Sequence, residues 1–307
     1  MGTTVEKLTK VLETKEAIRT SINNKGGTLT ESDTFSSYSA AIDNIQTGGG
    51  KNGVQQIIDN KLGDGKPTCR GLFQGYLGTS LDDALKNLDF SKVTDMCYMF
   101  HQCYNLISVP SFDTSNVTQM YYMFAGLHDR NGIYYMNLVS APYLDMQNVE
   151  SCASMFAYCD KLINVPQLNL SNVSKFNSMF YYCKSLKNLP PINNNNATDM
   201  QDMFGYCYLL EKIDIAKITW SAYSIFDCCY SLKTLIIRTM NTIPTLTSDA
   251  FDNCYHFYGT TNATYNPEGL KDGAIYVPDD KVDALKVATN WSVFADIIKP
   301  LSTLVEE

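Results

Sequence analysis

The stretch Asp95-Met-Cys-Tyr-Met-Phe-His-Gln-Cys-Tyr-Asn-Leu106 contains the unit that decides the fold, because its Met-Phe pair returns along the chain. Met99-Phe100 is followed by Met-Phe pairs that begin at residues 123, 155, 179 and 203, with gaps of 24, 32, 24 and 24 residues. A period of this length is typical of a unit that buries its apolar face only by stacking on copies of itself. The sequence therefore predicts an array of stacked repeats.

Cysteine and leucine complete the repeating unit. A cysteine lies three residues after the phenylalanine in most copies, and a leucine lies three residues after the cysteine. The copy at Phe124 lacks the cysteine and carries an eight-residue insertion around His128 to Gly132. The cysteine positions are Cys103, Cys159, Cys183, Cys207, Cys229 and Cys254. Because they share one repeat position, we expect them to form an internal column.

Two apolar spacings alternate within each unit. The run Val93, Met96, Phe100, Cys103 and Leu106 has the spacing of a short amphipathic helix. After the leucine, two later copies take the leucine-x-x-leucine-x-leucine spacing of a strand, at Leu210, Ile213, Ile215 and at Leu232, Leu235, Ile237. Earlier copies carry a proline in this segment, which suggests a bulge or a strand end. We therefore predict an α/β solenoid, with one short helix and one strand in each coil of roughly 24 residues.

The unit from Met99 to Thr118, Met-Phe-x-x-Cys-x-x-Leu-x-x-Val-Pro-x-Phe-Asp-x-Ser-Asn-Val-Thr, resembles the BspA-like leucine-rich repeats of bacterial surface proteins. The segment from Ala274 to Leu301 resembles the strand-plus-helix cap that closes such arrays. The resemblance covers roughly residues 70–305. It implies a leucine-rich-repeat solenoid over residues 54–272 and a C-terminal cap over residues 273–307.

The first 47 residues differ in kind from the repeats. Val5, Leu8, Leu12, Ile18 and Ile22 mark an amphipathic helix in a predicted attachment and oligomerisation module, residues 1–47. Residues 48–53 are a glycine-rich linker. The order Leu12-Glu-Thr-Lys-Glu-Ala-Ile-Arg, then Asn24-Lys25-Gly26-Gly27, then Thr34-Phe35-Ser-Ser-Tyr38 and Ile42-Asp-Asn-Ile45 resembles a leader found on many bacteriophage tail, baseplate and fibre proteins. That resemblance implies that the helix binds other virion proteins or copies of itself, with a homotrimer as the usual fibre arrangement.

The charge and the apolar pattern of the chain argue against some classes of function. The net charge of -8 and the absence of a Lys/Arg cluster argue against a nucleic-acid partner. No apolar run reaches the length of a membrane span, and the first residues lack the pattern of a secretory signal. We therefore expect a virion protein that assembles in the host bacterial cytoplasm. The alternatives are a bacterial cell-surface or secreted BspA-like adhesin and a capsid-decorating head fibre.

Motifs for catalysis and for metal or cofactor binding are missing from the sequence. It has no nucleophile elbow, phosphate loop or zinc-protease motif, and Cys-x-x-Cys does not occur. We expect no enzymatic activity, cofactor or metal; a carbohydrate-active variant is the enzyme alternative. The ten cysteines are interpreted as a buried core column, with disulfides as the alternative.

Tyrosine is the residue type best suited to binding, since rigid amphipathic rings lose little entropy on contact. The 20 tyrosines recur beside the repeat landmarks, and those one or two residues after the phenylalanine should lie off the inward side. The alternative is that they stack coil on coil for structural reasons. The insertion is a second candidate, because repeat insertions often gather on the binding face. The candidates for contact with a host glycan or protein are Tyr121, Tyr122, Tyr158, Tyr181, Tyr182, Tyr206, Tyr208, His128 and Arg130.

Overall fold

The computed structural model describes residues 18–19, 68–81, 85, 88–130, 132–219, 222–258 and 272–305. Val5, Leu8, Leu12 and Ile22 of the predicted attachment helix lie outside these residues, as does the linker at 48–53. Ile18 is described and has helical conformation. The attachment and oligomerisation role of the leader therefore stays a prediction.

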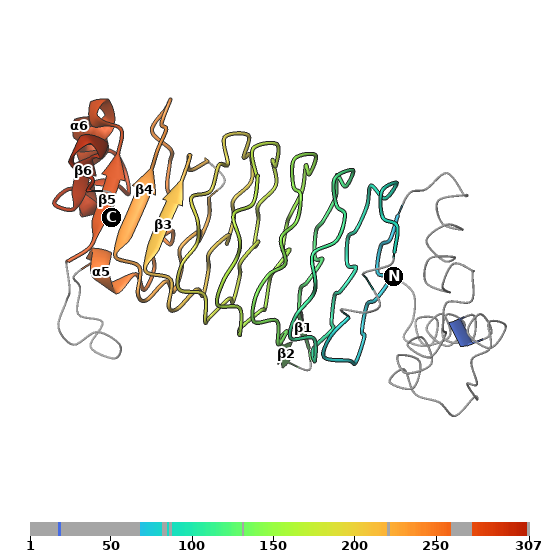
Figure 1. The fold of residues 1–307 in the computed structure, drawn as a ribbon. Helices are drawn as coiled ribbons and strands as arrows, with labels where there is room; N and C mark the ends of the chain where they lie inside the picture. The colour runs from blue at the N-terminus through green and yellow to red at the C-terminus, as the bar shows by residue number, and fades with distance from the viewer. Residues whose placement is uncertain are drawn as a thin grey trace.

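Successive repeats lie side by side as a row of stacked coils (Figure 1). Single parallel bridges join Asp95 to Gln119, Gln119 to Ser151, Ser151 to Lys175 and Lys175 to Asp199. The row begins one coil before Met99, since a further bridge joins residue 68 to Asp95. The described repeats therefore contact their neighbours along the whole row, as the period predicts.

The backbone of each coil bonds in two alternating directions. In the coil that contains Phe100, the N–H of this residue donates to the carbonyl of Met123 in the next coil at 2.8 Å. The N–H of the following residue, His101, donates back to the carbonyl of Tyr98 at 3.0 Å. The same alternation recurs in the later coils. Each coil is therefore a chain of tight turns in which every second amide bonds to the neighbouring coil.

Left-handed residues make this alternation possible. They occur two residues before and two residues after the repeated phenylalanine, with φ between 45° and 64°. The earlier position holds Tyr98, Tyr122, Ser154, Ser178, Asp202 and Ser224, and the later one holds Gln102, Tyr158, Tyr182, Tyr206, Cys228 and Asn253. In the first coil, Gly71 and Gly75 take these positions around Phe73, with φ of 63° and 74°. A left-handed residue interrupts an α-helix, so the one or two in each coil exclude a helix there.

The predicted α/β leucine-rich-repeat solenoid, with a helix and a strand in every coil, is therefore wrong. Within the described residues between 88 and 254 the structure has no α-helix. The apolar spacing of three and four residues that resembled a helix comes from successive turns that bring their side chains inward. Strands are also fewer than predicted, because most coils meet only through single bridges.

Within the described residues, regular structure consists of two sheets and a few short helices (Figure 1). β1 (Leu127–Asp129) and β2 (Gly132–Tyr134) form an antiparallel pair within the insertion. β3 (Lys212–Ile215), β4 (Thr234–Ile237), β5 (Ala274–Val277) and β6 (Ile298–Pro300) form a parallel sheet in that order. The helices are α5 (Tyr255–Tyr258), α6 (Val282–Val287) and the 3-10 segments η1 (Asp279–Lys281), η2 (Ser292–Phe294) and η3 (Leu301–Thr303).

A column of stacked phenylalanine rings runs through the core. Neighbouring rings have centroids 4.9–6.0 Å apart and planes within 28° of parallel. The column comprises Phe73, Phe100, Phe124, Phe156, Phe180, Phe204, Phe226 and Phe251. Phe294 and Trp291 pack edge-on against Phe251, and the Trp291 indole N–H donates to the carbonyl of Pro244 at 2.8 Å. The stacking therefore ends at the C-terminal segment.

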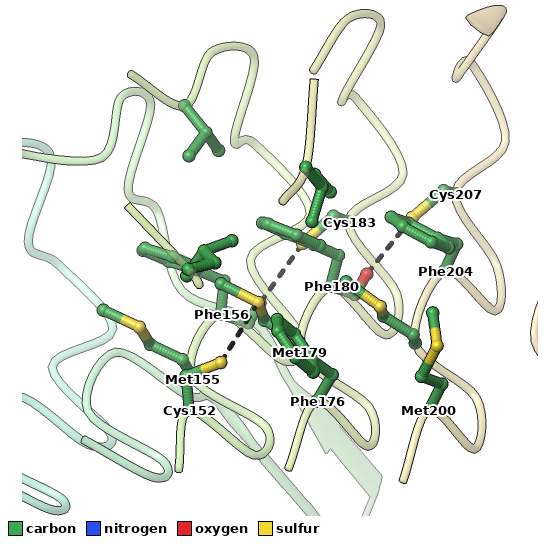
Figure 2. Close-up of a cluster of buried hydrophobic side chains, with 14 of the residues drawn as sticks. Cys152, Met155, Phe156, Phe176, Met179, Phe180, Cys183, Met200, Phe204 and Cys207 are labelled. Atoms are coloured by element: carbon green, nitrogen blue, oxygen red, sulfur yellow. Dashed lines mark hydrogen bonds between the residues drawn. The ribbon is translucent and has the colours of Figure 1, made fainter. Parts of the chain in front are cut away.

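The cysteines form the predicted internal column, and they are buried. Each Sγ of this column donates to the carbonyl of the phenylalanine in the preceding coil, at 3.0–3.3 Å. Figure 2 shows two of these contacts, Cys183 to Phe156 and Cys207 to Phe180. The thiol therefore adds a bond between coils to a carbonyl that also accepts a backbone N–H in its own coil, as the Phe156 carbonyl does from Cys159 at 3.2 Å.

Asparagine supplies a further set of bonds between coils. The side-chain amide of Asn148 donates to the carbonyl of Ser115 at 2.7 Å, and Asn116, Asn172 and Asn196 make the equivalent bond in their own coils. Asn194 is fully buried, and its side chain bonds to the backbone at Ala216 and Lys217. Asparagine in the turns is therefore part of the structure that joins the coils.

Candidate binding surface

Three tyrosines occupy the same repeat position in successive coils, two residues after the phenylalanine. The rings of Tyr158 and Tyr182 have centroids 5.4 Å apart and planes 30° from parallel. The rings of Tyr182 and Tyr206 are closer, at 4.3 Å and 14°. All three are left-handed residues, so the turn that excludes a helix also directs these side chains away from the core. The rings are half-buried.

The row continues at the position four residues after the phenylalanine. Tyr208 stacks on Tyr230 at 4.7 Å, and Tyr230 stacks on Tyr255 at 5.1 Å. Tyr206 joins the two rows, since its ring lies 6.3 Å from Tyr208. Tyr181 packs edge-on against the first row, between 4.8 and 5.7 Å from its rings. With Tyr135, described next, this group is called the tyrosine face: Tyr135, Tyr158, Tyr181, Tyr182, Tyr206, Tyr208, Tyr230 and Tyr255.

The insertion contributes to this surface. The β1–β2 hairpin is followed by Tyr135, whose ring lies 6.5 Å from Tyr158 and 6.4 Å from Tyr182. His128 on β1 lies 6.1 Å from the Tyr158 ring. Arg130 is exposed in the turn of the hairpin. The insertion therefore adds an aromatic ring and an imidazole to the middle of the tyrosine face.

Tyr121 and Tyr122 belong to a second aromatic cluster, nearer the start of the row of coils. Tyr98 and Tyr122 stack at 5.1 Å with planes 3° apart, and Tyr121 packs edge-on against both. The Arg70 guanidinium lies 4.8 Å from the Tyr121 ring, donates to its hydroxyl and pairs with Asp95 at 3.2 Å. The predicted site residues therefore fall into two groups, and Arg70 is the cation that contacts the group around Tyr121.

Lys184 is a functional candidate that sequence reasoning missed. Its ammonium lies 4.2 Å from the ring centroid of Tyr135, 5.4 Å from Tyr182 and 5.8 Å from Tyr208. It also donates a hydrogen bond to the Tyr135 hydroxyl at 2.7 Å. The signal was its repeat position, because Lys184 lies four residues after Phe180, where the next three coils have tyrosine.

Burial moves the titration of three tyrosine hydroxyls further above neutral pH. It raises the pKa of Tyr158 to about 12, with a further contribution from neighbouring Tyr182. Burial also raises the pKa of Tyr181 and of Tyr206, and Asp227 adds to the effect at Tyr206. A tyrosine hydroxyl is already protonated at neutral pH, so these three remain hydrogen-bond donors over a wider alkaline range than a free tyrosine does.

The tyrosine face carries charges of both signs. Burial raises the pKa of Asp202, and the nearby carboxylates of Asp227 and Asp249 raise it further. Lys184 lies among Tyr135, Tyr182 and Tyr208. The face is thus aromatic throughout, cationic at Lys184 and acidic at Asp202 and Asp227.

The described part of the chain contains no group of three His, Cys, Asp or Glu side chains placed to hold a metal ion. None of its helices combines the length and the apolar character that a membrane span requires. A hollow of about 350 Å³ is lined by threonines that include Thr219, Thr239 and Thr242, and by Lys217, but by none of the tyrosines.

Part of the chain is similar to a known protein family. Residues 68–188 and 137–220 match the model of a family described as Mycoplasma protein of unknown function, DUF285. No curated protein matches the chain. The matched residues include the coils that carry Tyr158, Tyr182 and Tyr206, but the family description assigns them no activity.

Proposed function

We propose that this chain is a non-enzymatic bacteriophage virion protein, a tail-fibre, baseplate or receptor-binding component that contacts the host surface through the tyrosine face. The observation that carries the recognition role is the continuous series of half-buried rings from Tyr158 to Tyr255, crossed by Tyr135 from the insertion.

The tyrosine face has the physical properties of a recognition surface. Its rings are stacked on one another, so they lose little further freedom when a ligand covers them. The rings offer apolar surface together with hydroxyl groups, apart from Tyr255, whose hydroxyl is buried, and this combination suits sugars and protein loops. A core built of Phe, Met and Cys already holds the coils together. The outer rings are therefore available for contact on their exposed side.

The placement in a virion rests on the leader, which resembles those of phage tail, baseplate and fibre proteins. In this proposal the amphipathic helix of residues 1–47 binds another virion protein or copies of itself, giving a homo-oligomer. The repeats then face outward from the particle.

A second candidate is a bacterial cell-surface or secreted protein that uses the same tyrosine face. The match to a family described as a Mycoplasma protein favours it, because that description names a bacterium and no phage. Immunogold labelling of phage particles and of bacterial cells from one culture separates the candidates. Label on particles supports the virion role, and label confined to cell surfaces contradicts it.

Binding of the full chain to intact cells of candidate host bacteria tests the recognition role. The Tyr182→Ser, Tyr206→Ser double variant removes two central rings and should weaken binding by about tenfold or more, as expected for aromatic anchors. Tyr143→Ser is the matched control, because Tyr143 is 60% exposed and lies outside the face. Equal binding by the double variant and the parent chain would contradict the role, provided that circular dichroism shows both folded.

A further inference from the structure

We propose that Lys184 is the point on the tyrosine face that binds the acidic group of a sugar, so that the ligand is a glycan bearing a carboxylate or a phosphate. This inference rests on the proposed recognition role and specifies its ligand.

The first observation is the position of the ammonium among aromatic rings. Tyr135, Tyr182 and Tyr208 come from the insertion and from two different coils, and all three rings lie within 6 Å of the Lys184 Nζ. Contacts of a cation with ring faces hold it in one place without neutralising it. The hairpin insertion delivers Tyr135, the nearest of the three rings, at 4.2 Å.

The second observation concerns the hydrogen-bond capacity of Lys184. An ammonium has three N–H donors, and this one donates to the Tyr135 hydroxyl. Asp160 holds the same repeat position one coil earlier; its Oδ2 pairs with the Lys161 ammonium at 3.5 Å, and its Oδ1 is buried without a hydrogen-bond partner. Within the described ranges, no carboxylate forms an ion pair with Lys184. Its charge therefore remains available to an anion from outside.

The third observation is the charge around this cation. The chain carries a net charge of -8, and the tyrosine face becomes acidic at Asp202 and Asp227. An anion is repelled by these carboxylates and attracted to Lys184, so the charge pattern places the acidic group of a ligand at Lys184. Neighbouring tyrosine rings stack 4.3–5.4 Å apart in this row, so they present a regular series of ring edges and hydroxyl groups. A glycan chain carries hydroxyl groups at regular intervals that can pair with such a row, so we take an acidic glycan as the ligand; an acidic protein segment is the alternative that the test separates.

Matched pairs of immobilised oligosaccharides test the proposal with the full chain. One arm compares oligogalacturonates with their methyl esters, and the other compares oligomannosides bearing 6-phosphate groups with their dephosphorylated forms. Each pair differs only in the anionic group, and the two arms separate carboxylate from phosphate. We expect at least one acidic member to bind about tenfold more tightly than its neutral partner, as a charge-assisted hydrogen bond implies.

Two variants test whether Lys184 is responsible for the preference for acidic over neutral oligosaccharides. Lys184→Met keeps a long apolar side chain beside the rings and should bring the acidic and neutral members to equal affinity. Lys187→Met is the matched control, because Lys187 is exposed in the same coil and outside the tyrosine face, and it should keep the preference. Retention of the preference by Lys184→Met, or equal binding of acidic and neutral members by the parent chain, would overturn the proposal.

The results that would reject the recognition role differ from those that would reject the assignment of Lys184. If the parent chain binds cells through Tyr182 and Tyr206 but prefers no acidic sugar, the role stands and the assignment of Lys184 is wrong. If acidic protein segments compete for the face and acidic sugars do not, the ligand is a protein, which also overturns the glycan assignment. If Tyr182 and Tyr206 are dispensable for binding to cells, the role itself fails.

Discussion

Tyr182 and Tyr206 lie 24 residues apart in the sequence, yet their rings stack at 4.3 Å with planes 14° apart. Both residues are left-handed, with φ of 64° and 62°. The same backbone conformation that excludes a helix from each coil therefore aligns the side chains of successive coils into one surface. The shape of the tyrosine face follows from the way the coils turn.

Replacing Ser178 with glycine tests whether this residue lies in a left-handed turn or in a helix. Ser178 has φ of 56° and is only half-buried. In the left-handed conformation a side chain costs about 1 kcal/mol relative to glycine, so Ser178→Gly should raise the free energy of unfolding by roughly that amount. In a helix the same change would lower it by a similar amount. Urea unfolding of the full chain measures the sign.

Alanine at the same position is the control for this prediction. Ser178→Ala should be neutral or slightly destabilising in a left-handed turn, whereas it would stabilise a helix. A chain stabilised by alanine and destabilised by glycine would contradict the turn structure.

His101 should make stability depend on pH. It is only 7% exposed, and burial lowers its pKa from 6.5 to about 4. Between these two values the unfolded chain binds a proton that the folded chain does not, so stability falls as the pH decreases from about 6.5 to about 4. The loss amounts to at most about 3 kcal/mol.

His101→Gln isolates this contribution, since glutamine is polar and has no titrating group. Thermal unfolding at pH 7 and pH 5 should show a smaller decrease for the variant than for the parent chain. Equal decreases would mean that His101 becomes protonated in the folded protein without cost.

The thiols should be unreactive in the folded protein. All ten cysteines are buried, and burial raises the pKa of Cys103 to about 12 and that of Cys183 well above its usual range. A thiol reagent at pH 8 should therefore modify almost none in the native chain and close to ten in denaturant without reductant. A low count in denaturant would indicate disulfides. Rapid reaction of the native chain would contradict the buried column.

The repeat and its inward side could be predicted from the sequence, because both depend on apolar periodicity. The cysteine column at Cys103 to Cys254 lies inside, as its shared position indicated. The sequence could not distinguish the turns of each coil from a short helix, because a series of turns brings apolar residues inward at the same spacing of three and four. Left-handed positions occupied by Tyr158 and Tyr182 carry no local signal, since only glycine, asparagine and aspartate favour that conformation.

The candidate site was predictable in part. Alignment on the phenylalanine placed Tyr158, Tyr182 and Tyr206 off the inward side, and the structure also stacks them coil on coil. The position of Tyr135 could not be read from the sequence, because it depends on the path of the hairpin. The repeat position of Lys184 was a sequence signal, but its contact with Tyr135, at 4.2 Å, depends on the same hairpin path.

Protection of tyrosines on the cell-bound chain tests the recognition role most directly. The full chain is iodinated free in solution and bound to cells, and the labelled tyrosines are identified by mass spectrometry. The account predicts that binding reduces labelling at Tyr158, Tyr182 and Tyr206 and leaves labelling at exposed Tyr143 unchanged. Protection at Tyr143 with unchanged labelling at Tyr182 and Tyr206 would place recognition elsewhere and contradict the account.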